Sequence, residues 1–146
     1  MNVEIRYFNG PSDWGWVQQH VNLKRVEDTC GLVAIDVEQN KTIGAAIFDN
    51  FIHSAATLTL IMETPLLIRH GFLDEAYDFL FHGCKKKYCY AMVAANNPRS
   101  IKLTEHVGYC EKMRIPDGFK PGVDFIVYEL AREDFYKNKN PLKEVA

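Results

Sequence analysis

The feature that most constrains the fold is a change in hydrophobic period between residues 72 and 95. Apolar residues recur at helical spacing over 72–82, whereas residues 88–95 (Tyr-Cys-Tyr-Ala-Met-Val-Ala-Ala) are almost continuously apolar or aromatic. Such a run is typical of a strand that is covered on both faces. The helix separates this strand from the one that ends at Met62, and a crossover of a dozen or more residues is what connects parallel neighbours. The pattern therefore predicts two parallel strands at the centre of a sheet.

Three runs before that helix predict an antiparallel meander. They cover residues 32–37, 42–48 and 55–62, with a short polar connection between the first two. Alternating apolar positions around such a connection are typical of a β-hairpin. The strand over 55–62 is then the parallel neighbour of the strand over 88–95.

The remaining segments complete a mixed architecture. Alternation over 3–8 predicts a first strand, and apolar spacing over 13–21 predicts a helix after it. Residues 100–107 predict a short helix, and residues 109–115 and 124–130 predict a final hairpin with a long connection. This order indicates an α/β (α+β) fold: a mixed sheet of about seven strands with helices on both faces.

The chain has the size of one domain, with 146 residues. We assign residues 1–135 to that domain, and we expect the polar tail, residues 136–146, to fray. The 17 basic and 19 acidic residues give a net charge of −2, which argues against a nucleic-acid binder that relies on a basic face. No apolar stretch reaches the roughly 18 residues that a membrane span needs.

The cysteines give no sign of a metal site or of disulfides. None of the four forms a C-x-x-C pair, and no signal segment opens the chain. The spacing of His82, Cys84 and Cys89 fits no common zinc finger. We therefore expect a cytoplasmic protein with reduced thiols and no metal.

The segment from Asn97 to Tyr109 reads Asn-Pro-Arg-Ser-Ile-Lys-Leu-Thr-Glu-His-Val-Gly-Tyr. It resembles the pattern N-x-x-S-x-x-L-x-E-x-x-G-F/Y, which the GNAT N-acetyltransferase superfamily carries directly after its fifth strand. Residues 111–114 and 127–135 are similar to the final hairpin of the branch that acetylates protein N-termini and aminoglycoside-like amines. The resemblance covers about residues 3–135.

This resemblance implies an acyl-CoA-dependent N-acyltransferase, with acetyl-CoA as donor and an amine of a protein or small molecule as acceptor. In the family, the two parallel strands splay at their C-terminal ends and leave backbone groups free for the pantetheine amides. Here the splay is expected between residues 61–63 and 94–96, with Asn97 holding it open through a side-chain bond. The residues expected to contact acetyl-CoA are Ile61, Met62, Glu63, Arg69, His70, Gly71, Asn97, Arg99 and Ser100.

The chain departs from the family's pyrophosphate loop, Q/R-x-x-G-x-G/A. Residues 68–73 keep only Gly71, and Phe72 or Leu73 stands at a glycine position. These side chains are expected to crowd the approach of a diphosphate to the backbone. Thr64 followed by a proline is also a helix start, so residues 65–82 form either one continuous helix or a helix that begins at 72. Arg69 and His70 are the residues that supply charge in place of the loop.

The candidate catalytic residues follow from the chemistry of amine acetylation, which needs a base for the ammonium and an acid for the leaving thiolate. Glu63, at the end of the fourth strand, is the candidate base. His53 is a second candidate that acts through a water if its loop folds over the cleft. Thr104 stands where many members carry a tyrosine, and its hydroxyl is a poor acid.

Two function classes stay open at this point. The first is the N-acyltransferase, favoured by the segment from Asn97 to Tyr109. The second is a protein of the same fold that has lost catalysis or coenzyme A binding and serves as an interaction module, favoured by the altered loop and the missing tyrosine. The sequence leaves the acceptor amine and the oligomeric state open, with a homodimer as one option.

Overall fold

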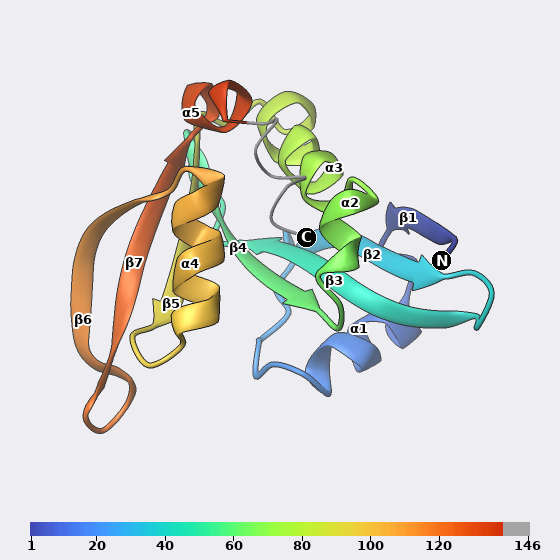
Figure 1. Ribbon diagram of the computed structural model, residues 1–146, viewed down its shortest axis with the longest axis horizontal. Coiled ribbons are helices and arrows are strands. Elements are labelled where there is room, and N and C mark those ends of the chain that lie inside the picture. The colour runs from blue at the N-terminus through green and yellow to red at the C-terminus, as the bar shows by residue number, and fades with distance from the viewer. Residues whose placement is uncertain (139–146) are drawn as a thin grey trace.

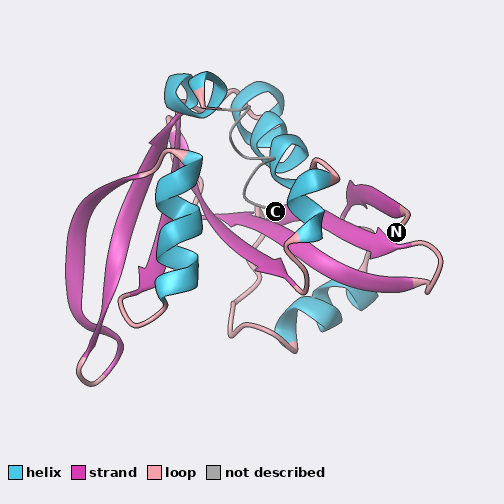
Figure 2. Ribbon diagram, viewed as in Figure 1, coloured by secondary structure: helices cyan, strands magenta, loops and turns pink. Residues whose placement is uncertain are grey.

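Seven strands form one mixed sheet in the computed structural model, which describes residues 1–138 (Figures 1 and 2). Their order across the sheet is β1-β2-β3-β4-β5-β7-β6, and only β4 and β5 are parallel. The strands are β1 (Val3–Tyr7), β2 (Cys30–Asp36), β3 (Lys41–Asp49), β4 (Ala55–Met62), β5 (Tyr88–Ala94), β6 (Cys110–Lys120) and β7 (Val123–Ala131). The predicted meander, the parallel central pair and the final hairpin are confirmed.

The helices lie on both faces of this sheet, as expected. They are α1 (Pro11–Gln18), α2 (Leu66–Arg69), α3 (Phe72–Asp78), the π-helical turn η1 (Phe79–Gly83), α4 (Pro98–Val107) and α5 (Arg132–Lys137). In η1 the N–H of Cys84 donates to the carbonyl of Phe79 at 2.8 Å, which is the wide turn that ends the helical segment. Within residues 1–138, no helix combines the length and the apolar character that crossing a membrane requires.

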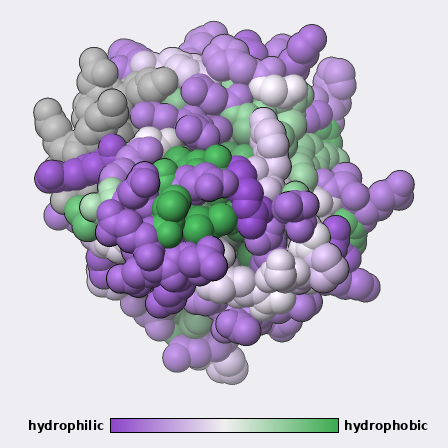
Figure 3. Space-filling view, turned by 90° about the vertical axis from the view of Figure 1, so that its right-hand side faces the viewer, coloured by the Kyte–Doolittle hydropathy of each residue, from purple (hydrophilic) through white to green (hydrophobic). Residues whose placement is uncertain are grey.

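Each face of the sheet carries its own apolar cluster, because side chains alternate along a strand. Leu58 of β4 packs into the larger cluster, which includes Phe72, Leu73 and Val107 of α3 and α4. Ile61 of the same strand belongs to the smaller cluster, with Trp14 and Val17 of α1. The sheet thus separates an α1 face from an α2–α3–α4 face. Figure 3 shows the end of the molecule on the right of Figure 1, which is mainly hydrophilic around a small hydrophobic patch.

The parallel strands pair over only part of their length. Three residues of β4, from Ala55 to Thr57, pair with three of β5, from Tyr88 to Tyr90, although β4 continues to Met62. Figure 1 shows the two strands diverging beyond this paired segment. The splay that the family resemblance implies is therefore present.

Several segment boundaries differ from the sequence expectations. α1 ends at Gln18, so Val21 lies beyond the helix and packs against the smaller cluster from a loop. β6 continues to Lys120 through an irregular register instead of giving way to a long connection. Tyr136 lies in α5 and its hydroxyl donates to Asp78 at 2.5 Å, so the expectation of fraying is wrong there. The rest of the predicted tail, residues 139–146, lies outside the described residues.

Candidate functional site

The site is built around the opening between β4 and β5. Beyond Thr57 and Tyr90 no residue of one strand pairs with the other. The β4 backbone groups from Thr59 to Met62 that face β5 therefore have no ladder partner. Backbone donors and acceptors need partners, and an extended ligand can supply them as an added strand would.

The segment after β4 contains a break that divides the helical region into α2 and α3. Gly71, between them, has a left-handed φ of 82°. A Cβ at this position would meet nothing within 4 Å, so the glycine faces open space. The alternative of one continuous helix over 65–82 is thus wrong, although Thr64 does accept a hydrogen bond from the Leu66 N–H at 3.3 Å, as a helix start would require.

Phe72 and Leu73 do not crowd this break. Their side chains are 0% and 1% exposed and belong to the larger cluster. Phe72 and Leu67 lie over Gly44 of β3, where an added Cβ would be 3.5 Å from the Phe72 ring and 2.5 Å from Leu67 Cδ1. The expectation that these side chains fill the diphosphate position is wrong, because both point into the core. Arg69 and His70, directly before the glycine, are exposed.

The start of α4 forms the other side of the opening, opposite α2 and α3 (Figure 1). The Asn97 side-chain oxygen accepts a hydrogen bond from the Ser100 N–H at 3.1 Å. This hydrogen bond is an N-cap, so the Asn97 side chain stabilises the start of α4. The resemblance had implied that this side chain instead holds the two strands apart, and that expectation is wrong. Arg99 is exposed in the first turn.

Glu63 follows β4 and turns its carboxylate toward the α1 face. Its N–H donates to the Ile43 carbonyl on β3 at 2.9 Å. One carboxylate oxygen lies 3.7 Å from His20 Nε2, and the other lies 3.8 Å from Lys41 Nζ. The Glu63 side chain is 32% exposed, so the group lies at the surface and a ligand can reach it.

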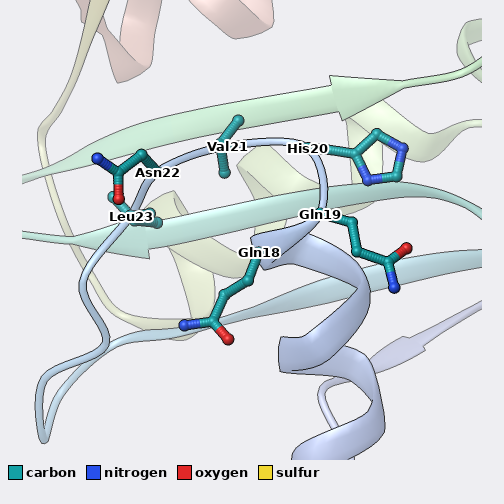
Figure 4. Close-up of a pocket in the computed structure, with 6 residues that line it drawn as sticks. All are labelled: Gln18, Gln19, His20, Val21, Asn22 and Leu23. Atoms are coloured by element: carbon teal, nitrogen blue, oxygen red, sulfur yellow. The ribbon is translucent and has the colours of Figure 1, made fainter.

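His20, which lies beside Glu63, is a candidate that the sequence analysis missed. It lies in the loop after α1, and its Nδ1 is 2.9 Å from the Trp16 carbonyl oxygen. Residues 18–23 line an open surface hollow of about 320 Å³. Figure 4 shows His20 and Gln19 pointing to the same side of this loop, and His20 lies near the end of β4. Nothing local in the sequence signals this contact, since Glu63 belongs to a different element.

Two of the expected catalytic residues lie elsewhere or lack a suitable group. His53 precedes β4, at the paired end of the strand. At about 3.3 Å per residue, the eight residues of β4 separate His53 from the end of the strand that carries Glu63 by more than 20 Å. One water cannot bridge this distance, so the expected water-mediated role beside Glu63 is wrong. Thr104 lies half-buried in the middle of α4, where its backbone carbonyl accepts from the Tyr109 N–H.

The buried tyrosines do not replace the missing acid. Burial, together with a hydrogen bond to Glu105, raises the pKa of Tyr128 to about 12. The hydroxyls of Tyr77 and Tyr109 are 2.8 Å apart, and burial raises the pKa of each well above its ordinary value. These hydroxyls are committed to structural hydrogen bonds within the core. Glu63 and His20, by contrast, have partly exposed side chains that can take up a proton.

No family model matches the sequence, and no curated protein matches it. Solved structures do match. A spermidine/spermine N-acetyltransferase, SpeG from Vibrio cholerae, solved with manganese ions, aligns with a TM-score of 0.76 and 17% identity over 92% of this chain and 95% of its own. The spermidine N-acetyltransferase from Vibrio cholerae in complex with CoA and spermine aligns with a TM-score of 0.74 and 16% identity, over 92% of this chain and 98% of its own. The chain has the same fold as these acetyltransferases, the GNAT fold.

Proposed function

We propose that the protein is an acyl-CoA-dependent N-acyltransferase that moves the acetyl group of acetyl-CoA to a primary amine. The observation that carries this proposal is the opening between β4 and β5, with its free backbone edge from Thr59 to Met62. A neighbour with this fold has been solved in complex with CoA and spermine. The interaction-module alternative loses the argument from the altered loop, since Phe72 and Leu73 lie in the core, and keeps only the argument from the tyrosine that is missing at Thr104.

The residues around the opening fit the donor. An extended pantetheine arm carries amides that can pair with the free β4 edge, as a peptide pairs with an edge strand. The open space at Gly71 and the exposed Arg69 and His70 beside it can receive a diphosphate. Arg99 lies across the opening as a second cation. Bound in this way, acetyl-CoA supplies a thioester whose acyl carbon is open to attack by an amine.

The chain's own contribution to the chemistry is a place for the amine and a group that takes its proton. A primary amine is protonated at neutral pH and cannot attack until it loses a proton. Glu63, at the end of β4 on the α1 face, and His20, 3.7 Å from it, are both accessible from solvent, so they can bind the ammonium and take its proton between them. This face is where an acceptor amine would reach a thioester held between the strands.

Calorimetric titration with acetyl-CoA, followed by measurement of free thiol release with a panel of primary amines, tests the proposal. We expect saturable binding and amine-dependent release of CoA. Lys137, in α5, lies apart from the opening, and K137A provides a control that removes one exposed cation. Absence of binding at millimolar acetyl-CoA would contradict the proposal and favour a protein of this fold that no longer uses the donor.

A further inference from the structure

The hydrogen bond to Trp16 fixes the tautomer of His20. A backbone carbonyl can only accept, so the Nδ1 at 2.9 Å from the Trp16 oxygen must carry the hydrogen. In the neutral ring, Nε2 then holds the free lone pair. The Trp16 ring packs against the imidazole, with centroids 4.1 Å apart and 33° between the planes, and so restricts the ring's orientation.

Nε2 lies 3.7 Å from the nearer carboxylate oxygen of Glu63. This distance is too long for a hydrogen bond between the two groups. The neutral imidazole nitrogen and the carboxylate oxygen are both hydrogen-bond acceptors. Together they suit a ligand that donates two hydrogen bonds from one atom. A primary ammonium is such a donor, because its nitrogen carries three hydrogens.

Groups from three elements face this pair, and one of them, Lys41, adds a further charge. Glu63 follows β4, and Lys41 at the start of β3 lies 3.8 Å from its second oxygen. From α1 and the loop after it, the neighbours are the uncharged Trp16 and Gln19. Lys41 is nearest to the second carboxylate oxygen, whereas His20 is nearest to the first. His20 is 30% exposed, so an amine can reach the pair from the solvent.

We propose that His20 and Glu63 form the acceptor-amine site and that His20 is the general base; this rests on the proposed acyltransferase function. The ammonium of the acceptor donates one hydrogen bond to Nε2 and one to Glu63. Nε2 takes a proton from the ammonium, which gives a free amine and an imidazolium that Glu63 stabilises. The amine nitrogen then bonds to the acyl carbon, the C–S bond breaks, and the thiolate leaves and is protonated. The second amine proton and the imidazolium proton pass to the thiolate and to solvent, which completes the balance.

The test compares H20Q and E63Q with H53Q, a histidine variant at the paired end of β4. We expect H20Q to lower kcat by about 100-fold or more, the scale of general base catalysis, with acetyl-CoA affinity within twofold of wild type. E63Q should raise KM for the amine and lower kcat less than H20Q does. H53Q should match the wild type. H20N is a second variant for use if H20Q unfolds, and thermal unfolding is followed for all of them.

The pH profile distinguishes a base from a residue that merely shapes the loop. At pH 10 a larger fraction of the amine arrives without its extra proton, so the loss caused by H20Q should shrink there. Tautomer-sensitive nitrogen NMR of the wild type should find the hydrogen on Nδ1 of His20. If H20Q transfers the acetyl group at the wild-type rate at pH 7, the role of His20 as base is overturned and the acyltransferase function stands. The same conclusion follows if H20Q lowers kcat equally at pH 7 and pH 10. A wild type that neither binds acetyl-CoA nor releases thiol would overturn both.

Discussion

Two helices begin beside the opening, and they are held in different ways. α4 starts with a side-chain cap from Asn97 and a proline at its first position. α3 has no side-chain cap and starts after a left-handed glycine, with Phe72 and Leu73 buried in the core. Local hydrogen bonding fixes the first helix start and tertiary packing fixes the second. The difference shows that the altered loop sequence before α3 can keep the backbone geometry of the site, because core packing of Phe72 and Leu73 sets that geometry.

The largest expected effect tests the packing side of this comparison. F72A removes a ring that is 0% exposed, so we expect a loss of about 3 to 5 kcal/mol in the free energy of unfolding. Chemical denaturation measures it. M113A is the control, because Met113 of β6 is 56% exposed and its truncation should change stability by less than about 0.5 kcal/mol. A small effect of F72A would mean that something other than packing holds the start of α3.

The next prediction asks which helix start binds the diphosphate. R69A, on the α3 side, should weaken acetyl-CoA binding by about 1 to 3 kcal/mol, the range for losing a charge-assisted hydrogen bond. R99A, on the α4 side, should have the smaller effect. In titrations at increasing ionic strength, the difference in acetyl-CoA binding free energy between R69A and wild type should shrink, since salt screens exposed charges. A larger loss with R99A would reverse the assignment of the two sides.

α1 adds a third kind of helix start, held by an ion pair. Asp13, in its first turn, is 4% exposed, receives two hydrogen bonds from Arg6 at 2.7 and 3.1 Å, and accepts the Asn9 N–H. D13N should cost about 2 kcal/mol, below the full cost of breaking a buried pair because Arg6 is 32% exposed. The measurement is denaturation at pH 7.

This ion pair also predicts a pH dependence. The hydrogen bonds from Arg6 hold the pKa of Asp13 below its ordinary value of 3.8. A lowered pKa in the folded state contributes stability above the ordinary value, and this contribution is lost as the pH falls through the folded-state pKa. The gap in stability between wild type and D13N should therefore narrow on acidification from pH 5 to pH 2. A constant gap would show that the pair contributes no charge-dependent stability.

The smallest effect tests the cap of α4. N97A removes the acceptor of the Ser100 N–H and should cost about 1 kcal/mol, the usual value for an N-cap. Thermal unfolding measures it, with N97D as the conservative variant that keeps a capping oxygen. Loss of the same size in N97D and N97A would mean that the side-chain amide has a contact besides the cap.

The same contrast explains what the sequence predicts and what it does not. The strands, the parallel pair and the start of α4 follow from periodicity and from a cap signal within a few residues. The break at Gly71 was not decided, because Thr64 gives a helix-start signal and the opposing contact with Gly44 belongs to β3. His20 was missed for the same reason, since its partner Glu63 follows β4. Contacts between elements set these features, and no local pattern encodes them.

The short parallel ladder has a mechanical consequence. Only three residue pairs join β4 to β5, whereas every other pair of neighbouring strands is joined by at least five. Tension that passes from β1 to β7 must cross this junction, which is the weakest seam of backbone hydrogen bonds in the sheet. The larger apolar cluster spans the seam, with Leu58 on one side and Val93 and Ile126 on the other. Side-chain packing across this junction therefore supplements the few backbone hydrogen bonds that join the two parts of the sheet.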